Sequence, residues 1–389
     1  MTAAPPIDPR PTVLVIGPVP PPAFGVAKAT ALMIDSPVLA ERLRVLHLDT
    51  SDRRGVANIG RFDLSNVWLA FEHAGRLVRL CLRDRPDVTL LTASQGTLGL
   101  LRDALLAGIG RIFGSKLAVY MRGSGYADLR SARGRPAAWI LRSLVKHSAL
   151  VLVLGESLVG MARAIDAKAK VAVAPNGCPP AVAPEAVGRR HDGHPVLAYI
   201  GRLSRDKGLD DALEVIRQVA AACPPVEVVL AGEWEPPDYE ALIRARVTQY
   251  GLEGAVHFPG PVDHEEKADL LERAWVLMLP SPSEGQPWVI LEAMSAGVPV
   301  VAMDTGSIAE TVGDGIAGFV VPVGEPGAMA ARVLELFDDD RLWKRMSEQA
   351  VERYTRQYTL EASHRRLAGE LCRIAERKRG PHDPAPGGD

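Results

Sequence analysis

The stretch LPSPSEGQPWVILEAMSAGVPVV, Leu279–Val301, joins the end of one short apolar run to the start of the next. Its flanks, Trp275–Ser281 and Pro299–Asp304, are predicted strands, and Trp288–Ala296 between them is a predicted helix. Gly297 ends that helix, and a proline shortly after it prevents the helix from continuing. The stretch therefore predicts a parallel strand–helix–strand unit, in which ligands bind outside the carboxyl ends of the strands.

The same alternation of apolar runs and helical patterns fills the rest of the chain. The first half contains six predicted strands, separated by helical patterns such as Leu64–Arg83 and Leu98–Phe113. A Pro/Gly/charged segment, Pro179–Pro195, is a predicted linker, and six further strands follow it. The predicted strands are Thr12–Pro18, Leu43–Asp49, Asp87–Ala93, Lys116–Gly123, Ala149–Gly155, Lys170–Gly177, Val196–Arg202, Val226–Gly232, Ala255–Gly260, Trp275–Ser281, Pro299–Asp304 and Gly318–Gly324. This pattern predicts an α/β protein of two Rossmann-like domains, whose parallel sheets face a central cleft.

Composition agrees with such a protein. The 389 residues are 47% hydrophobic and 24% charged, which suits two or three globular domains. No uncharged apolar stretch approaches the roughly 18 residues of a transmembrane helix, and the N-terminal residues do not resemble a signal peptide. The four cysteines form no CxxC pair, so neither a zinc site nor a disulfide framework is expected. These features predict a cytoplasmic protein.

Charge is distributed unevenly along the chain. Residues 1–190 contain 25 Lys and Arg against 14 Asp and Glu, whereas residues 191–389 contain 20 against 33. A basic half indicates an anionic partner such as a membrane surface, although two domains of different surface composition would show the same asymmetry. The helix in Thr97–Lys116 raises the same alternatives, because its apolar stripe with nearby basic residues suits either a membrane surface or a sheet.

Two loops contain residues suited to a nucleotide diphosphate. In the first, the N–H groups of Trp288 and Val289 begin a helix and can bind phosphate. Glu292, one turn deeper, can accept two hydrogen bonds from the vicinal hydroxyls of a ribose, and Glu284 in the loop would face a group beyond the phosphates.

A capping box formed by Ser283 and Gln286 would explain the same pattern without a ligand. In the second loop, YIGRLSRDKGLDDALEVI (Tyr199–Ile216), Arg202 and Lys207 flank a polar turn. They could clamp a diphosphate from two sides, or they could simply be solvated. Together the loops suit a nucleotide diphosphate joined to a sugar.

Three segments in this order resemble retaining glycosyltransferase family 4, which belongs to the glycosyl transferases group 1 and has the GT-B fold. They are IGRLSRDKG (Ile200–Gly208), FPGPVDHEE (Phe258–Glu266) and LPSPSEGQPWVILEAMSAGVPVVAMDTGSIAETV (Leu279–Val312). The resemblance extends from Val13 to about Leu371 and is weaker in the first half.

The resemblance assigns roles to the loop residues. Arg202 and Lys207 would bind the donor diphosphate, and Glu284 would contact the donor sugar with the backbone of Gly285, Gln286 and Pro287. Trp288 and Val289 would offer N–H groups to phosphate, and Glu292 would bind ribose. The sequence EGQPW departs from the family, which usually has Gly followed by an aromatic residue or Gly after the first glutamate, so the donor sugar is left open.

The first half carries weaker resemblances. Gly25, in the loop Gly17–Thr30, would let the backbone approach the donor phosphates. Arg122 stands where many relatives have a histidine beside the reaction centre and is a candidate catalytic residue; Lys28 and Arg130 are further candidate contacts. The expected domains are residues 1–187 for the acceptor and 193–355 for the donor, followed by a helix at 356–380 that returns to the first domain and a disordered tail at 381–389.

The expected activity is metal-independent hexosyl transfer, with retention of configuration, from a UDP-, GDP- or ADP-sugar to an acceptor hydroxyl. A glycan, glycolipid or small molecule would be the acceptor, in polysaccharide, glycolipid or envelope synthesis. No cofactor and no nucleic-acid partner are expected, and attachment to the inner face of the membrane is a further expectation. A nucleotide-sugar epimerase and a non-catalytic binding protein remain alternatives, whereas an NAD enzyme is disfavoured because no GxGxxG follows the first strand.

Overall fold

The computed structural model describes residues 8–21, 24–51, 64–126, 129, 136–188 and 193–376, without the side chains of 64–67. The chain divides into two compact units. Unit 1 contains Met1–Pro175 and Ser363–Asp389, and unit 2 contains Asn176–Ala362. No helix in these described ranges is both long enough and apolar enough to span a bilayer.

Unit 1 is built on a parallel six-stranded sheet in the order β2-β1-β3-β4-β5-β6. Its strands are β1 Thr12–Gly17, β2 Arg44–Asp49, β3 Val88–Thr92, β4 Lys116–Met121, β5 Leu150–Val153 and β6 Val171–Val173. All six coincide with predicted strands. Most of their residues are apolar because helices cover both faces of the sheet, so neither side of an inner strand meets water.

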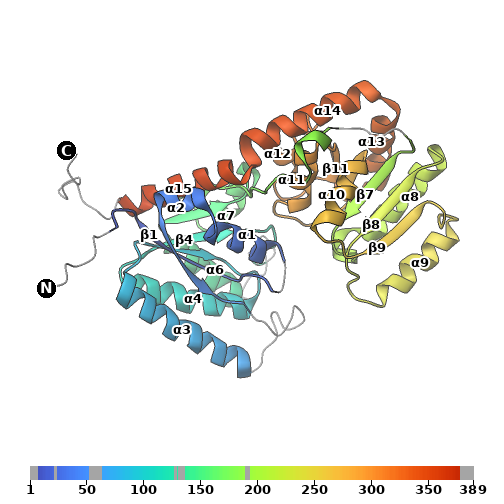
Figure 1. Cartoon of the computed structure of the whole chain (residues 1–389). Coiled ribbons are helices and arrows are strands. Elements are labelled where there is room, and N and C mark those ends of the chain that lie inside the picture. The colour runs from blue at the N-terminus through green and yellow to red at the C-terminus, as the bar shows by residue number, and fades with distance from the viewer. Residues whose placement is uncertain are drawn as a thin grey trace, which may run out of the picture. The chain divides into compact units, whose positions relative to one another are not determined.

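The helices of unit 1 form two layers (Figure 1). They are α1 Gly25–Ile34, α2 Pro37–Arg42, α3 Leu64–Asp84, α4 Thr97–Ile112, α6 Pro136–Lys146, α7 Val159–Ile165 and α15 Leu360–Glu376, of which the part from Ser363 belongs to this unit. Helices α3, α4 and α6 are successive neighbours on one face, and α1, α2 and α15 lie on the other. The histidine His364 of α15 contacts the N-cap hydroxyl of α2, with 2.8 Å between Nδ1 and Ser36 Oγ.

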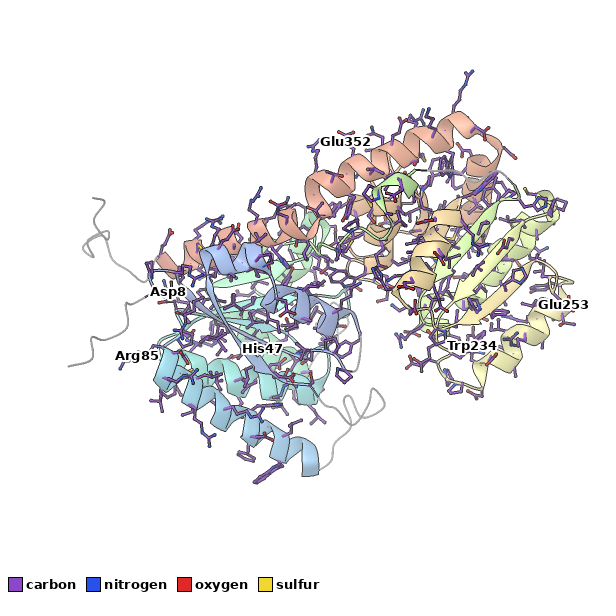
Figure 2. The ribbon with its side chains drawn as sticks, viewed as in Figure 1. Asp8, His47, Arg85, Trp234, Glu253 and Glu352 are labelled. Atoms are coloured by element: carbon purple, nitrogen blue, oxygen red, sulfur yellow. The ribbon has the colours of Figure 1, made fainter. Side chains whose placement is uncertain are left out.

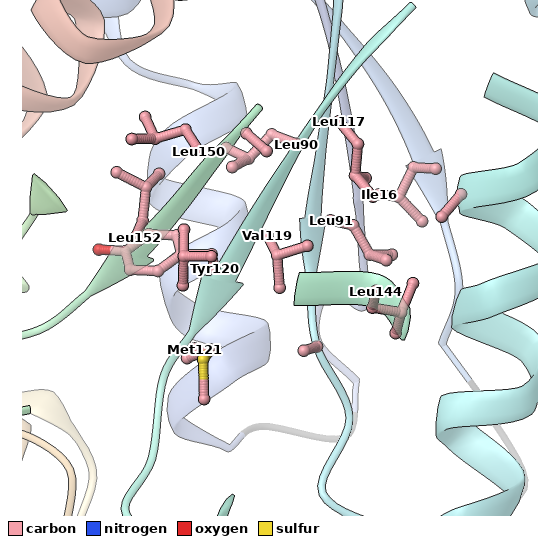
Figure 3. Packing of buried hydrophobic residues seen from close by; sticks show 14 of the residues in the cluster. Ile16, Leu90, Leu91, Leu117, Val119, Tyr120, Met121, Leu144, Leu150 and Leu152 are labelled. Carbon is pink, nitrogen blue, oxygen red and sulfur yellow. The ribbon is translucent and has the colours of Figure 1, made fainter. Parts of the chain in front are cut away.

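Large side chains of neighbouring strands fill the core of unit 1 (Figure 3). Leu90, Val119 and Leu152 come from β3, β4 and β5, and each is almost fully buried. Tyr120 is buried with its hydroxyl bonded to the carbonyl of Ala174, which satisfies the one polar group that this side chain brings into the core.

Unit 2 has a second parallel sheet, in the order β12-β11-β10-β7-β8-β9. Its strands are β7 Val196–Ile200, β8 Glu227–Ala231, β9 Val256–Gly260, β10 Val276–Leu279, β11 Val300–Met303 and β12 Gly318–Val321. The chain builds β7, β8 and β9 in one direction, and then places β10 on the other side of β7. This reversal creates the topological switch point at which such sheets bind ligands.

The helices of unit 2 follow their strands in the expected places. They are α8 Leu209–Ala222, α9 Tyr239–Gln249, α10 His264–Arg273, α11 Trp288–Ala296, α12 Ile308–Val312, α13 Pro326–Asp338 and α14 Asp340–Arg353, and a π-helical turn, Tyr354–Tyr358, comes after α14. Helix α11 has the bounds that the sequence predicts. Gly297 caps its end in the left-handed conformation with φ 73°.

The unit boundaries differ from the positions suggested by the linker pattern. Unit 2 begins at Asn176 rather than after residue 187, because Cys178, Ala181 and Val182 are buried in the core of unit 2. The chain returns to unit 1 at Ser363, within α15. The expected tail, residues 381–389, lies outside the described residues.

Candidate functional site

The candidate site lies at the carboxyl edge of the unit 2 sheet, where β7 and β10 end. Arg202 follows β7, and Lys207 ends the short 3₁₀ turn that leads into α8. Glu284 lies in the loop between β10 and α11. Because β7 and β10 are parallel neighbours, with Leu197 opposite Val276, both loops leave the sheet at the same edge.

Lys207 and Glu284 are in direct contact. The ammonium Nζ donates to Oε1 of Glu284 at 2.6 Å, and the two side chains are only 22% and 15% exposed. The backbone conformation of Gly208 determines the direction of the chain after Lys207. It has φ 75°, and a Cβ at this position would lie 1.9 Å from the carbonyl oxygen of Pro280. The turn that carries Lys207 is therefore packed against the end of β10.

Arg202 lies beside this pair and is held by two other carboxylates. Its NH2 group donates to Asp206 at 2.9 Å, and its NH1 group donates to Glu235 in the loop after β8. Burial alone would lower the pKa of Arg202, but the hydrogen bond to Glu235 and the charges of Asp206 and Glu284 outweigh it and raise the pKa. The guanidinium is thus charged, and nearly half of the side chain remains exposed.

The loop that follows β11 supports the loop of Glu284. Gly306 has φ 59°, and a Cβ there would lie 2.1 Å from the carbonyl oxygen of Glu284. The carbonyl of Gly285 accepts from the N–H of Ser307 at 2.8 Å and from its hydroxyl at 3.0 Å. Since the two loops touch through backbone atoms, the position of Glu284 depends on a glycine at 306.

The side chain and carbonyl of Gln286 fix the same loop through hydrogen bonds to two other parts of unit 2. Its Oε1 accepts from the N–H of Asn176 at 2.6 Å, its carbonyl accepts from Nδ2 of Asn176 at 2.9 Å, and its Nε2 donates to Thr311 at 3.0 Å. The capping box of Ser283 and Gln286 is not formed, because Pro287 is the N-cap of α11 and no side chain caps that helix.

Some backbone groups of this loop already form hydrogen bonds within the protein. The carbonyls of Gly285 and Gln286 already accept hydrogen bonds, and Pro287 has no N–H to donate. Trp288 and Val289 are the first two residues of α11, where N–H groups have no acceptor inside the helix. The start of α11 is therefore the part of the loop best suited to bind an anion.

Glu292 is paired with a cation that sequence reasoning missed. Its Oε1 accepts from Nζ of Lys267, on α10, at 2.9 Å, and its side chain is 8% exposed. Asp206 and Glu235, the partners of Arg202, were missed as well. Asp206 stands within the recognised turn, four residues after Arg202, which is a usable signal. No local pattern links Lys267 to Glu292 or Glu235 to Arg202, because these contacts depend on how the elements pack.

Of the predicted residues of unit 1, the structure describes Gly25, Lys28 and Arg122. Gly25 is the first residue of α1, in the connection that follows β1 at the switch point between β1 and β3. Arg122 follows β4, and its guanidinium lies over the ring of Tyr120, 4.3 Å from the centroid; burial lowers the pKa of Arg122. Lys28 is in α1, whereas Arg130 lies outside the described residues. The roles of Gly25 and Arg122 stay predictions.

Known proteins similar to this chain were found by sequence and by structure. The family model "Glycosyl transferases group 1" matches residues 185–353. Alpha-D-kanosaminyltransferase of Streptomyces kanamyceticus is 34% identical over 46% of this chain and 45% of its own length. The matched segment thus spans about half the length of the curated relatives.

Solved structures match over nearly the whole chain. Sucrose-phosphate synthase from Thermosynechococcus elongatus superposes with a TM-score of 0.72 at 17% identity, covering 95% of this chain and 100% of that one. The Anabaena protein HepE, in complex with UDP-glucose, gives a TM-score of 0.66 at 19% identity, covering 92% and 98%. The predicted GT-B fold is therefore confirmed, and the predicted resemblance to the group 1 glycosyl transferases is confirmed for residues 185–353.

Proposed function

We propose that the protein is a retaining glycosyltransferase of family 4 that transfers a sugar from a nucleoside diphosphate sugar to an acceptor hydroxyl. The contact between Lys207 and Glu284 at the carboxyl edge of the unit 2 sheet carries this proposal. It unites a cation suited to phosphate with a carboxylate suited to sugar hydroxyls, next to Arg202 and the start of α11. The names of the relatives, and the UDP-glucose bound to HepE, support the same class of donor.

The donor is proposed to lie along this edge. Arg202, Lys207 and the N–H groups of Trp288 and Val289 bind the diphosphate. Glu284 accepts hydrogen bonds from the transferred sugar. An ammonium has three N–H donors, so Lys207 can keep its bond to Glu284 while it binds a phosphate oxygen. This lysine would then couple recognition of the sugar to recognition of the diphosphate. Glu292, which accepts a hydrogen bond from Lys267, is proposed to bind the ribose hydroxyls.

The chemical step follows from this placement. The acceptor hydroxyl attacks the anomeric carbon from the face that the diphosphate leaves, so the configuration is retained. The bond from the anomeric carbon to the phosphate oxygen breaks, and that oxygen takes the proton of the acceptor. Negative charge grows on the leaving group, and Arg202 and Lys207 stabilise it in place of a metal ion. Arg122 and the loop of Gly25 are proposed to serve the acceptor side.

The remaining assignments complete the proposal. Unit 1 binds the acceptor, which is a glycan, a glycolipid or a small molecule, and unit 2 binds a UDP-, GDP- or ADP-sugar. The product belongs to polysaccharide, glycolipid or envelope glycan synthesis. The enzyme works in the cytoplasm and on the inner face of the membrane.

A two-stage experiment tests the proposal. UDP-, GDP- and ADP-sugars are first screened for thermal stabilisation, where a ligand at a hundred times its Kd adds about 2.7 kcal/mol to the free energy of unfolding. The stabilising donor is then incubated with candidate acceptors, and nucleotide release and the anomeric proton of the product are followed by NMR. We expect release that depends on the acceptor and a product with the anomeric configuration of the donor. Stabilisation without turnover would favour a binding protein, and an altered donor sugar without transfer would favour an epimerase.

A further inference from the structure

The solvent-facing side of helix α3 is unusual for a helix that covers a sheet. Its opposite side, with His73, Leu77 and Cys81, is buried in unit 1. Such a helix normally presents polar residues to water. Here Trp68 and Phe71 are 74% and 66% exposed. They belong to one helical stripe formed by the exposed residues Trp68, Phe71, Glu72, Gly75, Arg76, Arg79, Leu82 and Arg83.

The neighbouring helices continue this surface. The exposed stripe of α4 consists of Leu101, Leu105, Gly108, Arg111 and Ile112, and Ile112 is 83% exposed. On α6, Trp139 is 73% exposed and is followed on the same side by Arg142 and Lys146. Helix α4 contacts both α3 and α6, and Figure 1 shows α3 running beside α4. The exposed stripes of the three helices are therefore on adjacent helices. Of eleven exposed large hydrophobic residues in the described part of the chain, seven are on these three helices.

The charged residues of this surface are basic, with one exception. Its basic residues are Arg76, Arg79, Arg83, Arg111, Arg142 and Lys146. Among the described side chains of α3, α4 and α6, Glu72 is the only exposed acid, and it is paired with Arg76 at 2.7 Å. We call the three stripes together the basic–apolar face. Part of the positive charge of the first half of the sequence is thus gathered on this one face.

A cavity of about 380 Å³ lies on the arginine side of α3. Arg76, Arg79 and Arg83 line it together with His47 and Asp49 of the edge strand β2; Figure 2 labels His47. Arg79 has no ion pair with any described residue. The arginines therefore lie on the flank of α3 toward β2. By helical spacing, Phe71 and Leu82 lie on the other flank of the exposed stripe. Cations and apolar side chains thus form adjacent bands.

We propose that the basic–apolar face docks on a bilayer of anionic phospholipid. The tryptophan, phenylalanine, leucine and isoleucine side chains enter the boundary between headgroups and acyl chains, where amphipathic helices bind membranes. The guanidinium groups bind lipid phosphates, and the arginine cavity accepts one headgroup phosphate. A symmetric contact with a second copy is disfavoured because it would bring two sets of arginines together. The proposal does not depend on the transfer reaction.

Flotation with vesicles tests this proposal. The full chain is mixed with vesicles of phosphatidylcholine alone, or of phosphatidylcholine and phosphatidylglycerol in equal parts. We expect binding to the anionic vesicles only, weakened by added salt. The variant Arg76→Gln/Arg79→Gln/Arg83→Gln should bind on the order of a hundredfold more weakly, since each basic residue near the surface contributes about fivefold. Trp68→Ser/Phe71→Ser should also weaken binding, and circular dichroism checks that both variants fold.

Matched control variants lie in unit 2. Leu242→Ser/Val323→Ser removes exposed apolar side chains, and Arg341→Gln/Arg345→Gln/Arg356→Gln removes exposed arginines. Both should bind vesicles like the original protein. Equal binding to neutral and anionic vesicles, or equal losses in the control variants, would overturn the proposal. So would a dimer in sedimentation velocity that Trp68→Ser/Phe71→Ser dissociates while vesicle binding is absent, because the face would then be a contact between copies.

Discussion

At the scale of single residues, the two cations of the site are each paired with carboxylates of the protein itself. Lys207 is paired with Glu284, and Arg202 is paired with Asp206 and Glu235. Partly exposed pairs of this kind contribute little to stability, so their arrangement matters more for orienting the two cations than for holding the fold. A diphosphate that reaches the site meets side chains that are already directed toward one edge of the sheet.

We expect Lys207→Ala and Arg202→Ala each to lower turnover by about a hundredfold, because each removes roughly 3 kcal/mol of stabilisation from the leaving diphosphate. The measurement is acceptor-dependent nucleotide release at saturating donor. Arg205→Ala is a matched control. Arg205 lies in the same turn, but its guanidinium is over the ring of Tyr239, 5.3 Å from the centroid, and it faces Asp210. If all three variants lost activity equally, the specific roles of Arg202 and Lys207 would be refuted.

At the scale of elements, the loop of Glu284 is held in place by its neighbours. The loop after β11 contacts it through Gly306 and Ser307, and Asn176, the first residue of unit 2, holds it through Gln286. These supports are backbone contacts and buried hydrogen bonds. They tie the loop of Glu284 to two other parts of unit 2, so a change in either should move the carboxylate.

Gly306→Ala should lower turnover on the order of a hundredfold, which is the usual effect of misplacing a reacting group by about 1 Å. The added methyl would overlap the carbonyl oxygens of Glu284 and Gly285, at 2.1 and 2.4 Å. Gly315→Ala separates this effect from backbone strain. Gly315 has φ 75°, but nothing lies within 4 Å of its Cβ position, so this variant should lose about 1 kcal/mol of stability and keep its activity. Comparable kinetics in the two variants would contradict the clash.

The pair between α10 and α11 can be examined by a double-mutant cycle. Lys267→Met leaves the carboxylate of Glu292 buried without its cation, and we expect a loss of roughly 2 kcal/mol in the free energy of unfolding. Lys267→Met/Glu292→Met removes both charges and should recover most of that loss. Urea denaturation measures the stability of each variant. Strictly additive effects would show that the pair is not coupled.

The kinetics of Glu292 variants test whether this residue of α11 contributes to donor binding. Because the proposed partner of Glu292 is the ribose, which does not react, Glu292→Ala should mainly raise the KM for the donor and change kcat less. Initial rates over a range of donor concentrations separate the two constants. A loss confined to kcat would place this glutamate at the reacting centre instead.

At the scale of the whole molecule, two histidines are buried in the described part of unit 1. His73 and His364 are 2% and 5% exposed, and burial lowers the pKa of each to about 4. An imidazole in the unfolded chain has a pKa of about 6.5. Between these pH values the unfolded chain binds more protons than the folded chain, so the free energy of unfolding falls as the pH falls.

We therefore expect stability to be steady near pH 7 and to decline as the pH is lowered from 6.5 toward 4. His73→Leu should reduce this decline, since Nδ1 of His73 is buried without a hydrogen-bond partner among the described residues. The thermal midpoint measured at several pH values tests this expectation. The matched control is His257→Leu, which replaces an exposed imidazole. An unchanged pH dependence in His73→Leu would show that this residue is not a source of the acid sensitivity.

Much of the fold and of the site was predictable from local patterns. All twelve predicted strands are present, although most are shorter than their apolar runs. The run Lys170–Gly177 forms a strand only at Val171–Val173, because Asn176 turns away to bond Gln286. The bases Arg202 and Lys207 and the acid Glu284 do converge. Asp206, a partner of Arg202, could have been found from its spacing of four residues. Glu235, the other partner of Arg202, and Lys267, the partner of Glu292, could not, because these contacts depend on packing rather than on any local pattern.

By itself, the sequence determined which segments are strands and helices and where helix α11 ends. Apolar periodicity and turn residues encode these features locally. Only the tertiary structure decided that β10 lies beside β7 rather than beside β9, which brings Glu284 to Lys207, and that Lys267 pairs with Glu292. The physical reason is that parallel strands buried on both faces are almost uniformly apolar. Their order is therefore set by the packing of the complete sheet and its helices, and no single strand specifies its neighbours.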